Sequence, residues 1–310
     1  MSTHGGWNKV EKPIYRWVPT IERILTAERL PPLTGPLINI FSDYSGEQAG
    51  ALYQTTGILY ADLYASRSWE IRRRQVRKRF LADGRRLSFK ALGDRNRQAA
   101  LIPFLQAADE IEGLCLVVAV RRSIRQLCLE PTVSMAIAEY VTNRRARKSR
   151  ELERMARVTH LIALLIGGLA KVDQNVYWIS DQDSLFANEM VTQDTRELLM
   201  RFSSHYVGDR KLGELALGTV AIDPGDRFEE DGAAIADLTA GALGEILTRV
   251  SSHAGGRFRP GVAIPFSGSF TPKSELLHSW FTHNQGRLRK VCIMFEDLGA
   301  GELAVFRLDM

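Results

Sequence analysis

Cysteine is scarce in this sequence, and the few cysteines form no recognisable pattern. Cys115, Cys128 and Cys292 lie far apart, with no Cys-x-x-Cys pair, which excludes a zinc framework, a thiol redox motif and a disulfide scaffold. This usage is typical of a reducing compartment, so we expect a cytoplasmic protein. The 310 residues, 45% of them hydrophobic, are enough for a packed core without covalent cross-links.

Long hydrophobic runs are also missing. The longest, residues 161–170, is about half of what a membrane-spanning helix needs. The first residues lack the basic head and apolar stretch of a signal peptide. We therefore expect a protein without a membrane partner.

The standard catalytic motifs are absent as well. The sequence contains no Walker-type phosphate loop, no His-Glu-x-x-His, no Gly-x-Ser-x-Gly, and no Gly-x-Gly-x-x-Gly after a strand, which argues against several large enzyme classes. The stretch Asp181-Gln182-Asp183 lacks the glycine and the third oxygen ligand of a calcium loop. The chemistry must come from residues that no standard motif marks.

Apolar segments of strand length alternate with segments of helical periodicity, a pattern that predicts an α/β protein. We predict strands at residues 37–41, within 51–63, and at 87–92, 114–120, 175–180, 214–222, 290–295 and 303–308. We predict helices at residues 17–29, 66–79, 96–111, throughout 121–170, and at 231–250. The first two strands, and separately the last two, are expected to form hairpins.

The same pattern suggests a domain organisation. Residues 1–36 are interpreted as an N-terminal extension that ends near the breaker pair Pro31-Pro32. Residues 37–250 form the main domain, with a helical insertion at about 121–170. Residues 251–310 are expected to form a C-terminal β-hairpin segment.

Three aspartates stand in unusual local settings. Asp43 and Asp181 each directly follow an apolar strand, where a carboxylate could simply be a soluble strand end. Asp237 lies in a helix of apolar and small residues, and its neighbours on the helix face are Ala240, Gly241 and Gly244. That face could lie close against a sheet. A buried carboxylate is costly unless it pairs with a cation, a donor or a metal, so a salt bridge to a buried arginine is the structural alternative for Asp237.

These settings resemble a known family. The stretches Asp43-Tyr44-Ser45-Gly46, Trp178-Ile179-Ser180-Asp181 and residues 235–242, Ile-Ala-Asp-Leu-Thr-Ala-Gly-Ala, are similar in order and spacing to the family catalogued as domain of unknown function 3800. The resemblance covers about residues 37–250 and implies a ribonuclease H-like fold, with a mixed central sheet flanked by helices. The chain departs from the family at Tyr44, where a glutamate is common, and at Arg121-Arg122, where an acid would follow the strand.

The resemblance implies a metal-dependent nuclease. Asp43, Asp181 and Asp237 would be the catalytic carboxylates and would hold Mg²⁺ or Mn²⁺, both of which prefer oxygen ligands. Asp183 is an alternative to Asp181 as the mid-chain ligand, and the sequence leaves both open. The rival hypothesis is a catalytically inactive nucleic-acid-binding or protein-interaction module with the same fold, which Tyr44 and the arginines after Val120 favour.

A cluster of basic residues indicates that the protein binds nucleic acid. Nine arginines and lysines fall between Arg67 and Arg86 with only Glu70 and Asp83 opposing them, a density that can neutralise several phosphates of DNA or RNA. From this segment we predict contacts to nucleic acid by Arg72, Arg73, Arg74, Arg77 and Lys78. The alternatives are a solvated helix face or a contact to a protein partner in a homodimer. A second basic stretch, Arg144 to Arg157, contains Glu151 and Glu153, so intrahelical ion pairs explain much of it.

Overall fold

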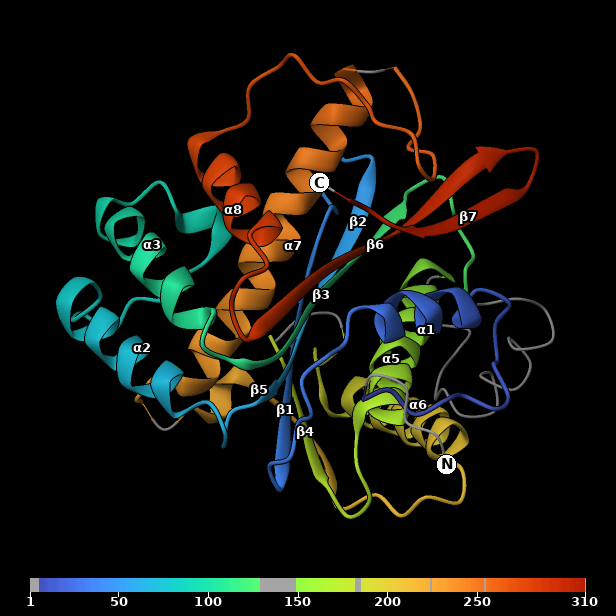
Figure 1. Ribbon diagram of the computed structural model, residues 1–310, viewed down its shortest axis with the longest axis horizontal. Helices are drawn as coiled ribbons and strands as arrows, with labels where there is room; N and C mark the ends of the chain where they lie inside the picture. The colour runs from blue at the N-terminus through green and yellow to red at the C-terminus, as the bar shows by residue number, and fades with distance from the viewer. Residues whose placement is uncertain (1–5, 129–148, 182–184, 224, 254, 310) are drawn as a thin grey trace.

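A seven-stranded mixed β-sheet forms the centre of the protein, in a computed structural model that describes residues 6–128, 149–181, 185–223, 225–253 and 255–309. The strands lie in the order β5-β4-β1-β2-β3-β6-β7 (Figure 1). Their bounds are β1 Leu37–Ser45, β2 Tyr53–Asp62, β3 Glu112–Arg121, β4 Asn175–Ser180, β5 Leu215–Thr219, β6 Leu288–Gly299 and β7 Glu302–Arg307.

The strand directions bring the carboxyl ends of most strands to one edge of the sheet. β1, β2 and β3 pair antiparallel in sequence order, whereas β4 pairs parallel with β1 and β5 pairs parallel with β4. On the other side β6 pairs parallel with β3, and β7 folds back on β6 as an antiparallel hairpin. The carboxyl ends of β1, β3, β4, β5 and β6 therefore all lie at the same edge.

Helices cover both faces, which makes three layers (Figure 1). One face carries α1 Val18–Ala27, α5 Ser149–Leu169 and α6 Glu189–Val207. The other carries α2 Arg67–Phe80, α3 Arg95–Ala108, α7 Phe228–His253 and α8 Pro272–Thr282. Because both faces are covered, the central strands are apolar on both sides and read as continuous hydrophobic runs.

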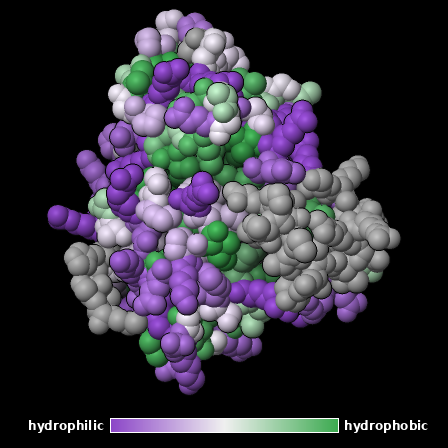
Figure 2. Space-filling view, turned by 90° about the vertical axis from the view of Figure 1, so that its right-hand side faces the viewer, coloured by the Kyte–Doolittle hydropathy of each residue, from purple (hydrophilic) through white to green (hydrophobic). Residues whose placement is uncertain are grey.

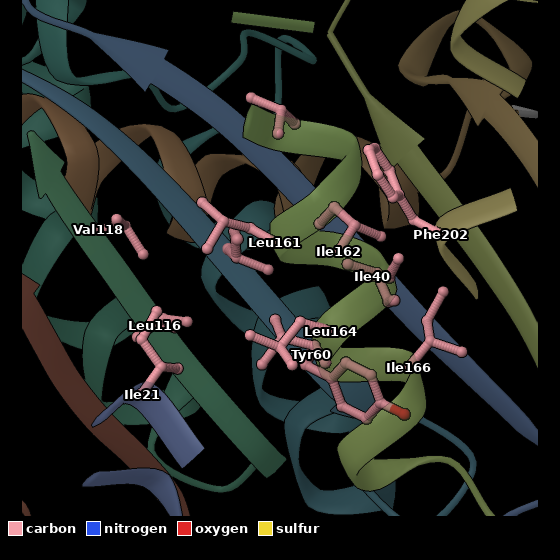
Figure 3. Close-up of a cluster of buried hydrophobic side chains, with 14 of the residues drawn as sticks. Ile21, Ile40, Tyr60, Leu116, Val118, Leu161, Ile162, Leu164, Ile166 and Phe202 are labelled. Atoms are coloured by element: carbon pink, nitrogen blue, oxygen red, sulfur yellow. The ribbon is translucent and has the colours of Figure 1, made fainter. Parts of the chain in front are cut away.

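Side chains of each strand alternate between two cores. In β2, Ile58 and Tyr60 belong to the core under α1, α5 and α6, whereas Leu59 and Ala61 belong to the core under α2, α3, α7 and α8. Figure 3 shows the first of these cores, where Ile40, Tyr60 and Leu116 of the sheet meet the apolar stripe of α5. Burial of this stripe explains why α5 has the longest apolar run of the sequence.

Much of the sequence-based prediction is confirmed. The expected helices at 17–29, 66–79, 96–111 and 231–250 correspond to α1, α2, α3 and α7, and both expected hairpins are present. The expected strands at 114–120 and 175–180 are β3 and β4. The end of the segment 214–222 is a short 3₁₀ turn, Val220–Ile222, after β5.

Three expectations were wrong. Residues 87–92 do not form a strand: they contain a 3₁₀ turn, Phe89–Ala91, whose Phe89 backbone is held by a side chain of α7. Residues 122–128 are not helical, while 129–148 lie outside the described residues. α5 packs against the central sheet as part of its core and is not an insertion outside it. Helices α6 and α8 were not expected, and α8 lies in the segment 251–310 for which only a β-hairpin was predicted.

Both terminal segments join the main body of the molecule. Val18, Ile21 and Leu25 of α1 are buried in the same core as α5, and the C-terminal hairpin extends the sheet beyond β3. Within the described ranges, no helix has the length and apolar character to cross a membrane. Figure 2 shows hydrophilic side chains over most of the face at the right of Figure 1, with hydrophobic ones exposed mainly in its upper half.

Candidate active site

A cleft of about 930 Å³ opens where the end of β1, the segment Arg86–Lys90 and the middle of α7 meet. We call it the aspartate cleft, because Asp43, Asp181 and Asp237 all line it. The three residues come from three separate parts of the chain, so the fold brings together the positions that the sequence singled out. Asp183 lies outside the described residues.

Asp43 and Asp181 are neighbours because their strands are. β1 and β4 pair in parallel with Ser42 opposite Ser180, so the next residue of each strand stands at the same edge of the sheet. Asp43 is half-buried, and its Oδ1 accepts a hydrogen bond of 2.6 Å from the backbone N–H of Tyr44. The side chain of Asp181 is 39% exposed and forms an ion pair of 3.5 Å with Arg86.

Small residues bring α7 close enough for Asp237 to reach the sheet. Thr55 of β2 donates a 2.8 Å hydrogen bond through its hydroxyl to the carbonyl of Ala240. A methyl group at Gly57 would collide with the carbonyl oxygen of Ala236, and one at Gly241 would collide with the ring of Phe89. The glycines of this contact, on both the strand and the helix, are therefore required by close packing, as the sequence predicted for the helix.

Asp237 is held from one side by backbone. Its Oδ2 accepts a 2.6 Å hydrogen bond from the N–H of Phe89, the residue that starts the 3₁₀ turn. Positive charge also acts on Asp237, because Arg86 and Lys90 lie near enough to favour its ionised form. No buried arginine pairs with Asp237 among the described residues, so the alternative of a structural salt bridge is not supported.

The charged form of each of these two half-buried aspartates is disfavoured by burial. Burial raises the pKa of Asp43 to about 7, and the nearby charges of Asp237 and Asp181 contribute to the rise. Burial also raises the pKa of Asp237, against the opposing effect of the Phe89 N–H. The two carboxyl groups lie close enough to interact, which raises the pKa of Asp43 and lowers that of Asp237. A bound cation would favour the ionised form of both.

A second acidic group lies at the start of α7. Asp223, Asp226 and Glu229 offer oxygens that all lie within 4.8 Å of one another, a spacing at which they could hold a metal ion. Most of these oxygens already have donors. The two oxygens of Asp223 accept four backbone N–H bonds, including those of Arg227 and Glu229. This arrangement is that of a helix N-cap, which the carboxylate stabilises without a metal.

The basic helix α2 must be reinterpreted, because its central arginines are buried. The side chain of Arg73 is 0% exposed and forms ion pairs with Glu70, Asp226 and Asp231. Arg77 makes a two-pronged contact with Asp231, with distances of 2.8 and 2.7 Å. The predicted phosphate contacts of Arg73 and Arg77 are therefore corrected: both guanidinium groups hold α2 to α7.

The other predicted contacts of α2 lie on the surface. Arg74 is 66% exposed but pairs with Glu70, and Arg72 is 53% exposed and lies 3.4 Å from Glu110. Lys78 is exposed. None of these three lines the aspartate cleft. A run of arginines looks the same in the sequence whether its side chains face solvent or pair with acids far along the chain. The sequence alone therefore could not distinguish the arginines that pair with α7 from the basic residues on the surface.

Other charged residues do line the cleft. Arg86, at the end of the basic segment, is one of them, and Lys90, Arg249 and Glu47 join it from loop and helix positions that carried no signal in the sequence. Arg86 and Lys90 stand beside Asp237, as its pKa reflects. The cleft therefore combines half-buried carboxylates with cations at its rim, an arrangement suited to a ligand that brings both a metal ion and a phosphate.

Comparisons with models of protein families, with curated proteins and with solved structures found no match. The function is therefore inferred from the fold and the cleft alone.

Proposed function

We propose that this protein is a metal-dependent nuclease with a ribonuclease H-like fold, which cleaves phosphodiesters of nucleic acid in the aspartate cleft. In such enzymes a mixed sheet supplies one carboxylate from its first strand and one from a neighbouring strand, and a helix packed across the sheet supplies a third. Here β1, β4 and α7 carry Asp43, Asp181 and Asp237. The observation that carries the proposal is that Asp43, Asp181 and Asp237 line one cleft, with Asp43 and Asp237 close enough together for Asp237 to raise the pKa of Asp43.

The donor set fits a hard divalent cation. Asp43 and Asp237 offer only oxygens, no histidine or cysteine lines the cleft among the described residues, and Mg²⁺ and Mn²⁺ prefer oxygen ligands. We propose that these two aspartates hold the ion, with Asp181 beside them. A bound ion would supply a water activated for attack and charge to neutralise the leaving oxygen.

The residues of the chain would position the rest. The N–H of Phe89 holds Oδ2 of Asp237, so Oδ1 is the oxygen that would bind the ion. Arg86 and Lys90 would bind the phosphate and place the bond to be broken near the aspartates. Arg86 is held by Asp181 at 3.5 Å, so a substrate phosphate would compete with this carboxylate for the guanidinium.

The surroundings of Asp181 and Tyr44 favour the alternative function, a catalytically inactive module that binds nucleic acid or a protein. Asp181 already has a cation partner in Arg86, Arg86 and Lys90 also favour the ionised form of Asp237, and Tyr44 stands where the resembled family carries glutamate, so fewer uncompensated carboxylates remain for a metal ion. In that case the cleft would bind nucleic acid or a protein without cleaving it.

The experiment that separates the two is the substitution Asp237→Asn. It keeps the bond from Phe89 and removes the charge, so we expect cleavage of a mixed DNA and RNA panel to disappear. We also expect the melting temperature without metal to stay the same or rise, because charge repulsion is relieved. The stabilisation by excess Mn²⁺ seen in the wild type should be lost.

The control for this experiment is Glu229→Gln, in the acidic group at the start of α7. We expect this variant to keep both cleavage and the stabilisation by Mn²⁺. The proposal fails if Asp237→Asn retains metal-dependent cleavage, or if Glu229→Gln and not Asp237→Asn loses the effect of Mn²⁺ on melting.

A further inference from the structure

A second cleft, of about 520 Å³, is rich in arginine and lies near the same edge of the sheet, beside the start of α5. We call it the arginine cleft. Its lining residues are Gln54, Arg122, Ile124, Arg125, Gln126, Arg150, Glu153 and Arg157. Its volume falls within the range of about 300–1,000 Å³ typical of sites for small organic ligands. Four guanidinium groups oppose a single carboxylate, so the cleft suits an anion.

The single acid of the arginine cleft is already bound to backbone. Glu153 is buried, and its oxygens accept hydrogen bonds from the N–H groups of Leu127, at 3.0 Å, and Cys128, at 3.1 and 3.2 Å. These bonds tie the loop after β3 to α5. The carboxylate therefore has a structural use, and it offsets only part of the positive charge around it.

Arg157 is the most informative member of the set. The residue is only 5% exposed, and its Nη2 donates a 2.8 Å hydrogen bond to the side-chain oxygen of Gln54. Its Nε is buried without a hydrogen-bond partner among the described residues. A buried donor left unpaired is costly. An anion in the cleft would relieve that cost, because Arg157 lines its wall.

Two more arginines of the arginine cleft are accessible to a ligand. Arg125 and Arg150 are both exposed, and neither forms an ion pair with any residue in the described part of the chain. Arg122 donates to the backbone carbonyls of Gln48 and Ala51, in the loop that also lines the aspartate cleft. The loop between β1 and β2 thus lines the aspartate cleft and is hydrogen-bonded to Arg122 of the arginine cleft.

A small hollow of about 10 Å³ lies between the two clefts. It shares Tyr44, Ser45 and Glu47 with the aspartate cleft, and Gln54 and Arg157 with the arginine cleft. Arg154 of α5 lies in this hollow, 4.5 Å from the centre of the Tyr44 ring, and pairs with Glu47. An aromatic ring with a guanidinium stacked on it is a surface on which a nucleic-acid base can stack.

We propose that the arginine cleft binds the backbone phosphates of a single-stranded flank of the substrate, which runs from the aspartate cleft past Tyr44 and Arg154. This inference deepens the proposed function and rests on it. The size of the arginine cleft, about 520 Å³, suits one strand rather than a duplex. Arg125, Arg150 and Arg157 contact phosphates, and Tyr44 places the strand between the two clefts.

The test measures binding without cleavage. The full chain is titrated, in the presence of a chelator, into a fluorescent single-stranded oligothymidylate at several salt concentrations. For the double variant Arg125→Gln/Arg150→Gln we expect Kd to rise by about fivefold or more, and the slope of log K against log salt to flatten by about 1.4, from two lost contacts to a single strand. Both side chains are exposed, so the fold should persist, which a melting curve checks.

The matched control is Arg72→Gln/Lys78→Gln, two exposed cations of α2 that line neither cleft. It should leave Kd and slope nearly unchanged. The inference is overturned if the control loses binding and the arginine variant does not, or if a free mononucleotide displaces the probe as tightly as an oligonucleotide of the same base.

Failure of the inference can be told from failure of the proposed function. If the wild type cleaves with Mn²⁺ but the arginine variant binds and cleaves normally, the inference alone is wrong. If binding depends on the arginines but no metal restores cleavage, the nuclease is wrong and the arginine cleft stands as the binding site of the rival module.

Discussion

Asp43 carries a charge that the folded protein disfavours. Its ordinary pKa is 3.8, and burial together with Asp237 and Asp181 raises it to about 7. The folded chain therefore holds a proton on Asp43 between about pH 4 and pH 7, where the unfolded chain has lost it. It follows that the stabilising effect of this proton is complete below pH 4 and is lost as the pH rises through 7.

This linkage predicts the behaviour of Asp43→Asn, which has no charge to lose. Without metal, the variant should be more stable than the wild type at pH 8, by on the order of 1–3 kcal/mol. The difference should shrink as the pH falls toward 4. Denaturant unfolding of both chains at several pH values measures it. A difference independent of pH would mean that Asp43 is not a perturbed carboxyl group.

The sequence could locate these aspartates because each stood out against its local pattern. Asp43 and Asp181 ended apolar strands, and Asp237 was a charge on a helix of small residues. The mutual contact of Asp43 and Asp237 could not be read in the same way, because it depends on how α7 crosses the sheet. The cations at the rim, Lys90 and Arg249, had no local signal at all.

At the scale of elements, α2 and α7 are held together by buried charge. Arg73 meets Asp226 and Asp231 more than 150 residues further along the chain, and Arg77 shares Asp231. Because the partners are distant in sequence, the basic run of α2 resembled a phosphate-binding surface. The helix itself was predicted correctly, since Trp69 and Val76 form an apolar stripe that is buried together with Arg73.

The buried pairs predict that Arg73→Gln is strongly destabilising. The substitution leaves the buried Asp231 with only part of its compensation, so we expect a loss of about 3–5 kcal/mol in the free energy of unfolding. Arg74→Gln, which alters an exposed pair on the same helix, should cost about 1 kcal/mol or less. Urea unfolding of the two variants makes the comparison. Equal, small losses would contradict the assignment of Arg73 to the core.

The contact between β2 and α7 makes a separate prediction. In Gly57→Ala the added methyl group meets the carbonyl oxygen of Ala236, so α7 must shift. We expect a destabilisation of about 1–3 kcal/mol and a clear loss of cleavage, because Asp237 moves with the helix. Gly93→Ala is the control, since a methyl group there meets nothing within 4 Å. Full activity in Gly57→Ala would show that the cleft tolerates a displaced helix.

On the scale of the whole molecule, the alternation of strands and helices predicted an α/β protein, and the seven-stranded sheet between two helical layers agrees with it. What could not be predicted is the pairing of β6 with β3, which joins residues 175 positions apart, such as Gly113 and Leu288. Local periodicity identifies an element but not its distant neighbour. The C-terminal hairpin therefore looked like a separate segment, although it extends the central sheet.

The sheet also explains why both clefts lie where they do. Five strands end at one edge, and that edge carries Asp43, Asp181 and the loop that leads to the arginine cleft. Ligands of open α/β sheets bind outside the carboxyl ends of the strands. The proposed path of a nucleic-acid strand follows this edge from one helical layer to the other.

The central claim is that the aspartate cleft holds a divalent metal ion, and its most direct test is the anomalous diffraction of crystals soaked in Mn²⁺. We predict a peak between the carboxylates of Asp43 and Asp237, with Asp181 next to it, and no peak there in Asp237→Asn crystals. A wild-type peak only at Asp223, Asp226 and Glu229, or no peak at either acidic group, would contradict the account.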